Sequence, residues 1–138
     1  DKEGSKVLVD GLHLFPEPEP VSSGMIYIVS TLSKNSALSG YRDLYKIGYT
    51  DTTVEQRVAN AEKDKTFLEA PVRIVSTAQC FNFDPHKLEV LIHGFLHKQR
   101  LNIKLTAKDG SLYHPREWFA VPLATAQAVI QYIIDGTI

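Results

Sequence analysis

The pattern of hydrophobic and polar positions after residue 24 predicts three strands. Residues 25–30, 43–49 and 71–80 are rich in β-branched and aromatic side chains, which is typical of strands. We expect the second strand to run antiparallel to the first. A fourth extended segment, residues 112–121, is interrupted at Pro115.

Three other segments show helical signals and complete the predicted fold. Thr53 is a good N-cap for a helix to about residue 64, and Asp84 is a cap for a helix through about residue 99. Residues 123–135 form an Ala-rich third helix. The order predicts a mixed α/β domain (α+β), a small three-stranded, mainly antiparallel sheet flanked by helices.

A proline-rich segment marks the predicted domain boundary. Prolines alternate between Phe15 and Pro20, and such a segment is extended and cannot join a helix. We therefore divide the chain into an N-terminal arm or linker, residues 1–23, and a domain, residues 24–138. The first residue is not Met, so we expect a fragment of a larger polypeptide. The arm is a candidate for that junction, or for pairing two chains in a homodimer.

The composition fits an ordinary globular protein. The chain has 138 residues, 43% hydrophobic and 22% charged, which excludes a disordered or fibrous chain. No apolar run reaches the length of a membrane helix, so we expect no membrane partner. A single cysteine, Cys80, excludes a disulfide framework and favours a reducing, cytoplasmic compartment.

The charge distribution is more informative than the net charge of −1. Residues 86–108 contain one acidic residue, Glu89, and five basic ones, Lys87, Lys98, Arg100, Lys104 and Lys108. This stretch is either a solvated helix face and loop or an anion-binding surface.

The predicted second helix places candidate chemistry beside its apolar stripe. The apolar stripe consists of Leu88, Leu91, Ile92, Phe95 and Leu96. A polar row next to it consists of His86, Glu89, His93 and His97. A carboxylate suits Mg²⁺, and a carboxylate with imidazoles also suits Zn²⁺ or Fe. The alternative is that these are rim residues making ordinary hydrogen bonds.

Strand alternation and helix position single out further side chains. Lys46 and Gly48 share one face of the second strand, and a strand glycine suggests close approach of a backbone or a ligand. Arg57 lies on the flank of the first helix and needs a carboxylate or a phosphate, because a guanidinium is costly to bury alone.

Taken together, these motifs resemble the GIY-YIG nuclease family over about residues 24–121. The matching pieces, in chain order, are Met25-Ile26-Tyr27, Lys46-Ile47-Gly48, Arg57, Glu89 with His93, and Arg116-Glu117-Trp118-Phe119. The Lys-Ile-Gly triplet and the closing Glu-Trp-Phe are typical of its phage and bacterial branch.

Three positions depart from that family's pattern. Met25 stands where the first triplet has Gly. Lys46 stands at the tyrosine position of the second triplet, unless Tyr45 takes that role in another register. Ala61 stands where some members carry His or Tyr.

The resemblance implies a metal-dependent endonuclease that hydrolyses DNA with Mg²⁺ or Mn²⁺. Glu89 would hold the metal, Tyr27 would act as general base on water, and Arg57 would pair with the phosphate. Lys46 would support Tyr27 or touch the phosphate, and His93 would orient the water or Glu89. The candidate nucleic-acid contacts are Lys98, Arg100, Lys104 and Tyr49.

Two rival functions remain open from the residues. One is a catalytically weak or inactive module of the same fold that binds nucleic acid or protein. The other is a different metal enzyme built on Glu89, His93 and His97. Glu117 and Trp118 are assigned a structural role, with Trp118 packing the last strand on a helix.

Overall fold

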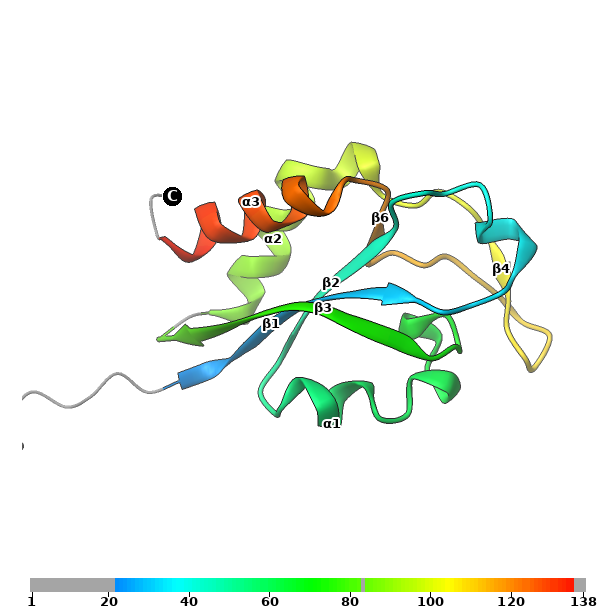
Figure 1. The fold of residues 1–138 in the computed structure, drawn as a ribbon, viewed down its shortest axis with the longest axis horizontal. Helices are drawn as coiled ribbons and strands as arrows, with labels where there is room; N and C mark the ends of the chain where they lie inside the picture. Colours follow the sequence, from blue (N-terminus) through cyan, green and yellow to red (C-terminus); the bar gives the residue numbers. More distant parts are fainter. Residues whose placement is uncertain (1–21, 83, 136–138) are drawn as a thin grey trace, which may run out of the picture.

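A four-stranded antiparallel sheet forms the centre of the protein, in the order β3-β1-β2-β6. The computed structural model describes residues 22–82 and 84–135. The strands of this sheet are β1 (Ser22–Thr31), β2 (Tyr45–Thr50), β3 (Val72–Phe81) and β6 (Trp118–Phe119). Helices α2 (Pro85–Leu96) and α3 (Leu123–Ile134) cover one face, and α1 (Val54–Val58) lies on the other (Figure 1). A separate hairpin pairs β4 (Leu105–Thr106) with β5 (Leu112–Tyr113).

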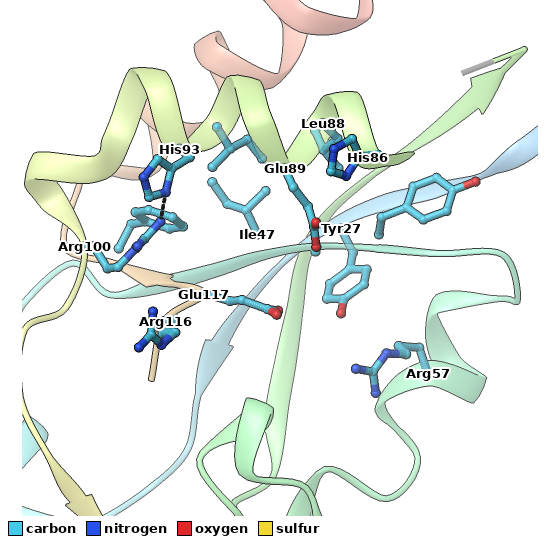
Figure 2. A pocket seen from close by; sticks show the side chains of 14 residues that line it. Tyr27, Ile47, Arg57, His86, Leu88, Glu89, His93, Arg100, Arg116 and Glu117 are labelled. Atoms are coloured by element: carbon cyan, nitrogen blue, oxygen red, sulfur yellow. Dashed lines mark hydrogen bonds between the residues drawn. The ribbon is translucent and has the colours of Figure 1, made fainter. Parts of the chain in front are cut away.

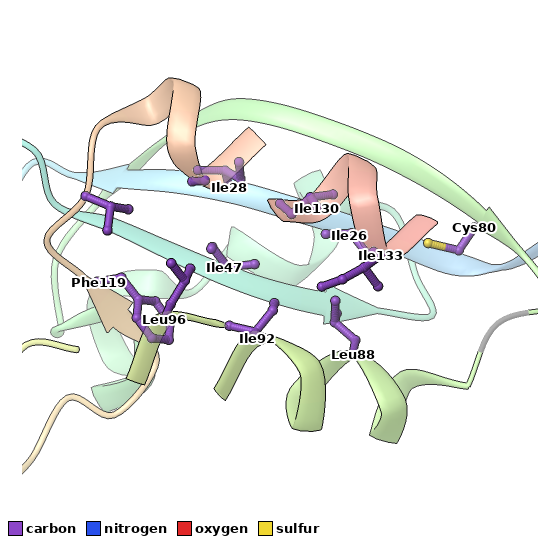
Figure 3. Close-up of a cluster of buried hydrophobic side chains, with 12 residues drawn as sticks. Ile26, Ile28, Ile47, Cys80, Leu88, Ile92, Leu96, Phe119, Ile130 and Ile133 are labelled. Atoms are coloured by element: carbon purple, nitrogen blue, oxygen red, sulfur yellow. The ribbon is translucent and has the colours of Figure 1, made fainter. Parts of the chain in front are cut away.

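Strand alternation divides the hydrophobic core between the two faces of the sheet. Ile26 and Ile28 of β1 and Ile47 of β2 pack against α2 and α3 (Figure 3). Tyr27 and Val29 belong to the cluster on the α1 side. The alternation predicted for β2 is therefore confirmed, because Ile47 and its neighbour Lys46 lie on opposite sides.

The register of β2 leaves part of its outer edge open. Strand β1 pairs with all of β2, and Tyr27 lies opposite Gly48. Strand β6 covers only Tyr45 and Lys46 on the other side. Beyond the bond from the Ile47 amide to the Glu117 carbonyl oxygen (3.4 Å), the β2 edge faces a pocket.

The sheet has four strands where the sequence predicted three. The extended segment 112–121 divides at Pro115, so that β5 joins the hairpin and β6 joins the main sheet. A two-residue strand is too short to show alternation in sequence. Pairing with Tyr45 and Lys46 makes it part of the sheet.

The first helix is shorter than predicted, whereas the other two agree. The Thr53 cap is confirmed, and Gln56 completes a capping box. The α-helix ends at Val58, and Asn60 leaves helical geometry with φ −115° and ψ 33°. Ala61 then begins a short 3₁₀ turn and stays buried, which preserves the apolar face. Helix α2 ends at Leu96 and continues as a 3₁₀ turn to Gln99.

One member of the predicted α2 stripe is exposed, and Leu91 is only partly buried. Leu88, Ile92 and Leu96 enter the core as expected. Phe95 is 48% exposed and meets Tyr132 of α3 edge to face at 5.7 Å between ring centres. The buried face of α2 is therefore narrower than the predicted stripe and leaves out Phe95.

The predicted N-terminal arm falls largely on residues 1–21, which lie outside the described residues. Strand β1 already begins at Ser22, two residues before the predicted domain start. Within the described ranges, none of the helices has the length and apolar character needed to cross a membrane.

Candidate functional site

The pocket beside the open edge of β2 has a volume of about 720 Å³. Its walls come from β1, β2, α1, α2, the turn after α2 and the segment around β6. Figure 2 shows side chains from these elements pointing toward one common space. Because β2 lacks a neighbour at this point, groups from both faces of the sheet meet around its edge.

Gly48 allows the Tyr27 phenol to reach this edge. A Cβ atom at Gly48 would lie 2.4 Å from both the Oη and the Cζ of Tyr27, which is impossible without displacement of the ring. Tyr27 is only 1% exposed, yet it forms part of the pocket wall. A close approach at this glycine was predicted correctly, but the approaching group is the Tyr27 side chain and not the predicted backbone or ligand.

Lys46 lies behind Tyr27 and does not line the pocket. Its side chain is 1% exposed, and its Nζ donates to Oε1 of Glu117. The ammonium lies 5.2 Å from the Tyr27 ring centre and 5.0 Å from that of Phe67. Burial directs the charge of Lys46 to Glu117 and away from the pocket. This position favours the predicted supporting role toward Tyr27 over contact with a phosphate.

Arg57 faces the pocket from α1, and contacts with Asp64 and Phe67 fix its side chain. Its Nη1 donates to Oδ2 of Asp64 at 3.2 Å, and its guanidinium lies 4.6 Å from the Phe67 ring centre. Burial raises the pKa of Asp64, but hydrogen bonds from Thr66 and Arg57 outweigh it and leave that pKa below its ordinary 3.8. Asp64 therefore stays ionised and fixes Arg57 at the pocket wall.

Glu89 projects from α2 toward the space above Tyr27 (Figure 2). No described residue forms an ion pair with its carboxylate. Glu117 contributes a second carboxylate to the wall, and only its Oε1 is engaged by Lys46. Mg²⁺ is commonly bound through one or two carboxylates while it keeps several waters. The donor set of this pocket therefore fits such an ion.

His93 is tied to Arg100, which comes from the turn after α2. Nη2 of Arg100 lies within hydrogen-bond distance of Nδ1 of His93. An arginine nitrogen can only donate, so Nδ1 accepts and the proton of neutral His93 lies on Nε2. The ring also stacks on His97, with centres 6.0 Å apart.

The rival site built on Glu89, His93 and His97 does not form. In the part of the chain that the structure describes, no group of three His, Cys, Asp or Glu residues could hold a metal. His97 does not line the pocket, and Nδ1 of His93 is occupied by Arg100.

The pocket brings together most of the residues singled out from the sequence. Those that line it are Tyr27, Gly48, Tyr49, Arg57, His86, Glu89, His93 and Arg100. Lys98 and Lys104 are exposed and lie outside its wall. Burial, with smaller effects of Cys80 and Asp51, raises the pKa of the Tyr49 phenol.

Two pocket residues were missed by the sequence reasoning, Arg116 and Glu117. Glu117 was assigned a structural role together with Trp118, which is fully buried and donates from Nε1 to the Thr66 carbonyl oxygen at 3.0 Å. The signal for Glu117 was the lysine at a central position of β2, because a buried ammonium requires an acidic partner.

Sequence comparison decides the family. The profile of the T5orf172 domain matches residues 24–134. The chain belongs to the T5orf172 domain family. The earlier resemblance to GIY-YIG nucleases is therefore wrong as an identification, since the matching family is a different one. Packing explains why the triplets Met25-Ile26-Tyr27 and Lys46-Ile47-Gly48 occur together. Tyr27 lies opposite Gly48 in the paired strands, and only a glycine leaves room for its ring.

A similar protein is found among the curated proteins. The uncharacterized protein YeeC of Bacillus subtilis (strain 168) is 42% identical over 116 residues, which are 84% of this chain and 30% of YeeC. The chain thus spans less than a third of the length of that relative. No solved structure shows a significant match.

Proposed function

We propose that this T5orf172 domain is a metal-dependent endonuclease that hydrolyses phosphodiester bonds of DNA in the pocket beside β2. The observation that supports the proposal is the meeting of three chemically distinct groups around one strand edge. They are the phenol of Tyr27, the guanidinium of Arg57 and the carboxylate of Glu89. These groups come from β1, α1 and α2, so the fold assembles them from distant parts of the sequence.

Glu89 would hold Mg²⁺ or Mn²⁺, with the free oxygen of Glu117 on the same wall. When bound, such an ion stabilises the negative charge that develops on phosphoryl and leaving oxygens. Glu89 is suited to this role because none of the described residues neutralises its charge.

Arg57 binds the phosphate that is cleaved. Its planar fork matches two phosphate oxygens, and Asp64 fixes its orientation through the 3.2 Å hydrogen bond. Since charge on these oxygens increases in the transition state, a positioned guanidinium stabilises that state more than the bound substrate.

Tyr27 takes the role of general base. In its phenolate form the Tyr27 oxygen accepts a hydrogen bond from the attacking water and receives the proton as the water oxygen bonds to phosphorus. The bond to the 3′ oxygen breaks at the same time, and the leaving 3′ oxygen takes up a proton from solvent. Lys46, whose ammonium lies 5.2 Å from the Tyr27 ring centre, packs behind the ring and supports its position.

Nicking of supercoiled plasmid at low salt, with Mg²⁺ and then Mn²⁺, tests this function. We expect Glu89→Gln, Tyr27→Phe and Arg57→Ala each to lower the nicking rate by about 10²–10³. Glu55→Gln is the matched control, because Glu55 is exposed on α1 and lies outside the pocket wall. Nicking that survives Glu89→Gln would contradict the proposed site.

A nucleic-acid-binding module without catalysis is the second candidate function. Lys46 is withdrawn from the pocket, and no three-ligand metal group occurs within residues 22–82 and 84–135. Both observations favour binding alone. DNA binding that persists in a chelator, with no nicking in either metal, would establish this alternative.

A further inference from the structure

We propose that Arg100 and Arg116, with His93, form a second phosphate subsite in the same pocket. This subsite would bind the phosphate next to the one that is cleaved. The inference rests on the proposed function and adds a substrate class to it. The substrate is then a strand carrying adjacent phosphates, and not a single nucleotide or a terminal phosphate.

Arg100 has an unsatisfied hydrogen-bond donor. Its Nε is buried and has no hydrogen-bond partner in the described structure. Buried polar groups nearly always have a partner, so an exception requires an explanation. The guanidinium carbon lies 5.8 Å from the Phe119 ring centre, and Nη2 is directed to His93. A bound anion would complete the donors of a side chain that is already held in place.

Arg116 adds a second cation at the same end of the pocket. Its side chain is exposed, lines the pocket, and forms no ion pair with the described residues. The neighbouring Glu117 pairs with Lys46 and forms no ion pair with Arg116. Figure 2 shows Arg100 and Arg116 at one end and Arg57 at the other, with Glu89 and Tyr27 between them.

His93 contributes a donor to this end. Since Nδ1 accepts from Arg100, Nε2 of neutral His93 carries the proton and can donate to a phosphate oxygen. The arginines supply the charge and His93 supplies a directed hydrogen bond.

The size and charge of the pocket fit a strand better than one phosphate group. Its volume of about 720 Å³ falls in the range of sites that bind drug-sized ligands, which are larger than a single phosphate group. The cations are divided between the two ends, while Glu89 lies between them. This arrangement matches phosphates on both sides of a reacting centre.

Binding without metal provides the first test. The probe is a fluorescein-labelled DNA duplex of about 20 base pairs, in EDTA, with anisotropy measured at several salt concentrations. We expect Arg100→Gln and Arg116→Gln each to weaken binding about tenfold. Each should also lower the slope of log affinity against log salt by about 1.

Arg73→Gln is the matched control for these variants, because Arg73 is exposed on β3 and lies outside the pocket wall. Arg100→Lys keeps the charge and replaces Arg100→Gln if circular dichroism shows that the latter is unfolded. It should keep the salt slope while weakening binding through the loss of the planar fork. Unchanged affinity and slope in both pocket variants would overturn the subsite.

A comparison of two substrates provides the second test. Bis(p-nitrophenyl) phosphate has one phosphodiester and no neighbouring phosphate. With Mn²⁺, Arg100→Gln should lower kcat/KM for the DNA duplex about tenfold more than it lowers kcat/KM for the small diester. Arg57→Ala should lower both. Equal loss on the two substrates in Arg100→Gln would contradict the second subsite. If the wild type hydrolyses neither substrate, the proposed enzyme fails, while the binding test still decides the subsite.

Discussion

The face of the sheet beneath α2 and α3 is lined by hydrophobic side chains, whereas the face toward α1 buries a lysine between two aromatic rings. Ile26, Ile28 and Ile47 pack into the first face. On the second face Lys46 lies against Tyr27 and Phe67. Burial of apolar area stabilises the face beneath α2 and α3. On the α1 face, part of the interior is occupied by Lys46 and Tyr27, which are held in fixed positions. The pocket lies where the two faces meet, at the open edge of β2.

The largest expected effect comes from the apolar face. Ile28→Ala removes buried methyl groups from β1, and we expect a loss of about 3 kcal/mol in the free energy of unfolding. Urea unfolding measures it. Plasmid nicking below the unfolding transition should be unchanged, because Ile28 lies outside the pocket wall. Loss of nicking in a folded variant would show that the two faces are not separable.

Removal of Glu117 should destabilise the protein more than removal of its ion-pair partner Lys46. Glu117→Gln leaves Lys46 buried without a counter-charge, which should cost about 3 kcal/mol. Lys46→Met leaves Glu117 with 47% of its side chain exposed to water, so we expect a change below about 1 kcal/mol. Equal losses in the two variants, measured by urea unfolding, would refute this account of the pair.

Gly48→Ala tests the contact between Tyr27 and the strand edge. The new Cβ would overlap the phenol, and overpacking of this kind costs about 1–3 kcal/mol. We expect a fall in nicking of about 10², because the proposed general base, Tyr27, would be displaced. Gly94→Ala is the control, since a Cβ there meets nothing within 4 Å. Normal nicking by Gly48→Ala would place the base elsewhere.

The smallest effect concerns Asp64, whose pKa is lowered in the folded protein. A carboxylate with a lowered pKa stabilises the fold above its unfolded pKa, and this contribution is lost as the pH falls through the folded value. Asp64→Asn should therefore be less stable than wild type at pH 7, by under about 1 kcal/mol because the pair is partly exposed. Urea unfolding at pH 7, 5 and 3 should show the difference shrinking below the ordinary pKa of 3.8. A difference that is constant with pH would exclude the ion pair as its cause.

Local patterns in the sequence determined most of the secondary structure. Strands β1, β2 and β3 and helices α2 and α3 follow from periodicity and caps, as does the opposite facing of Lys46 and Ile47. These properties depend on neighbours a few residues apart, which is why a single sequence carries them. Tyr27, Arg57 and Glu89 were singled out by residue type, spacing and a family resemblance that proved wrong.

Only the tertiary structure decided what these side chains contact. The partner of Lys46, the entry of Arg116 and Glu117 into the pocket, and the joining of β6 to β2 all depend on residues far apart in the chain. The burial of Lys46 follows from packing between Tyr27 and Phe67, which the pattern of β2 alone does not show. Periodicity specifies which face a side chain takes, but the charge, space and hydrogen-bond partners on that face come from other elements.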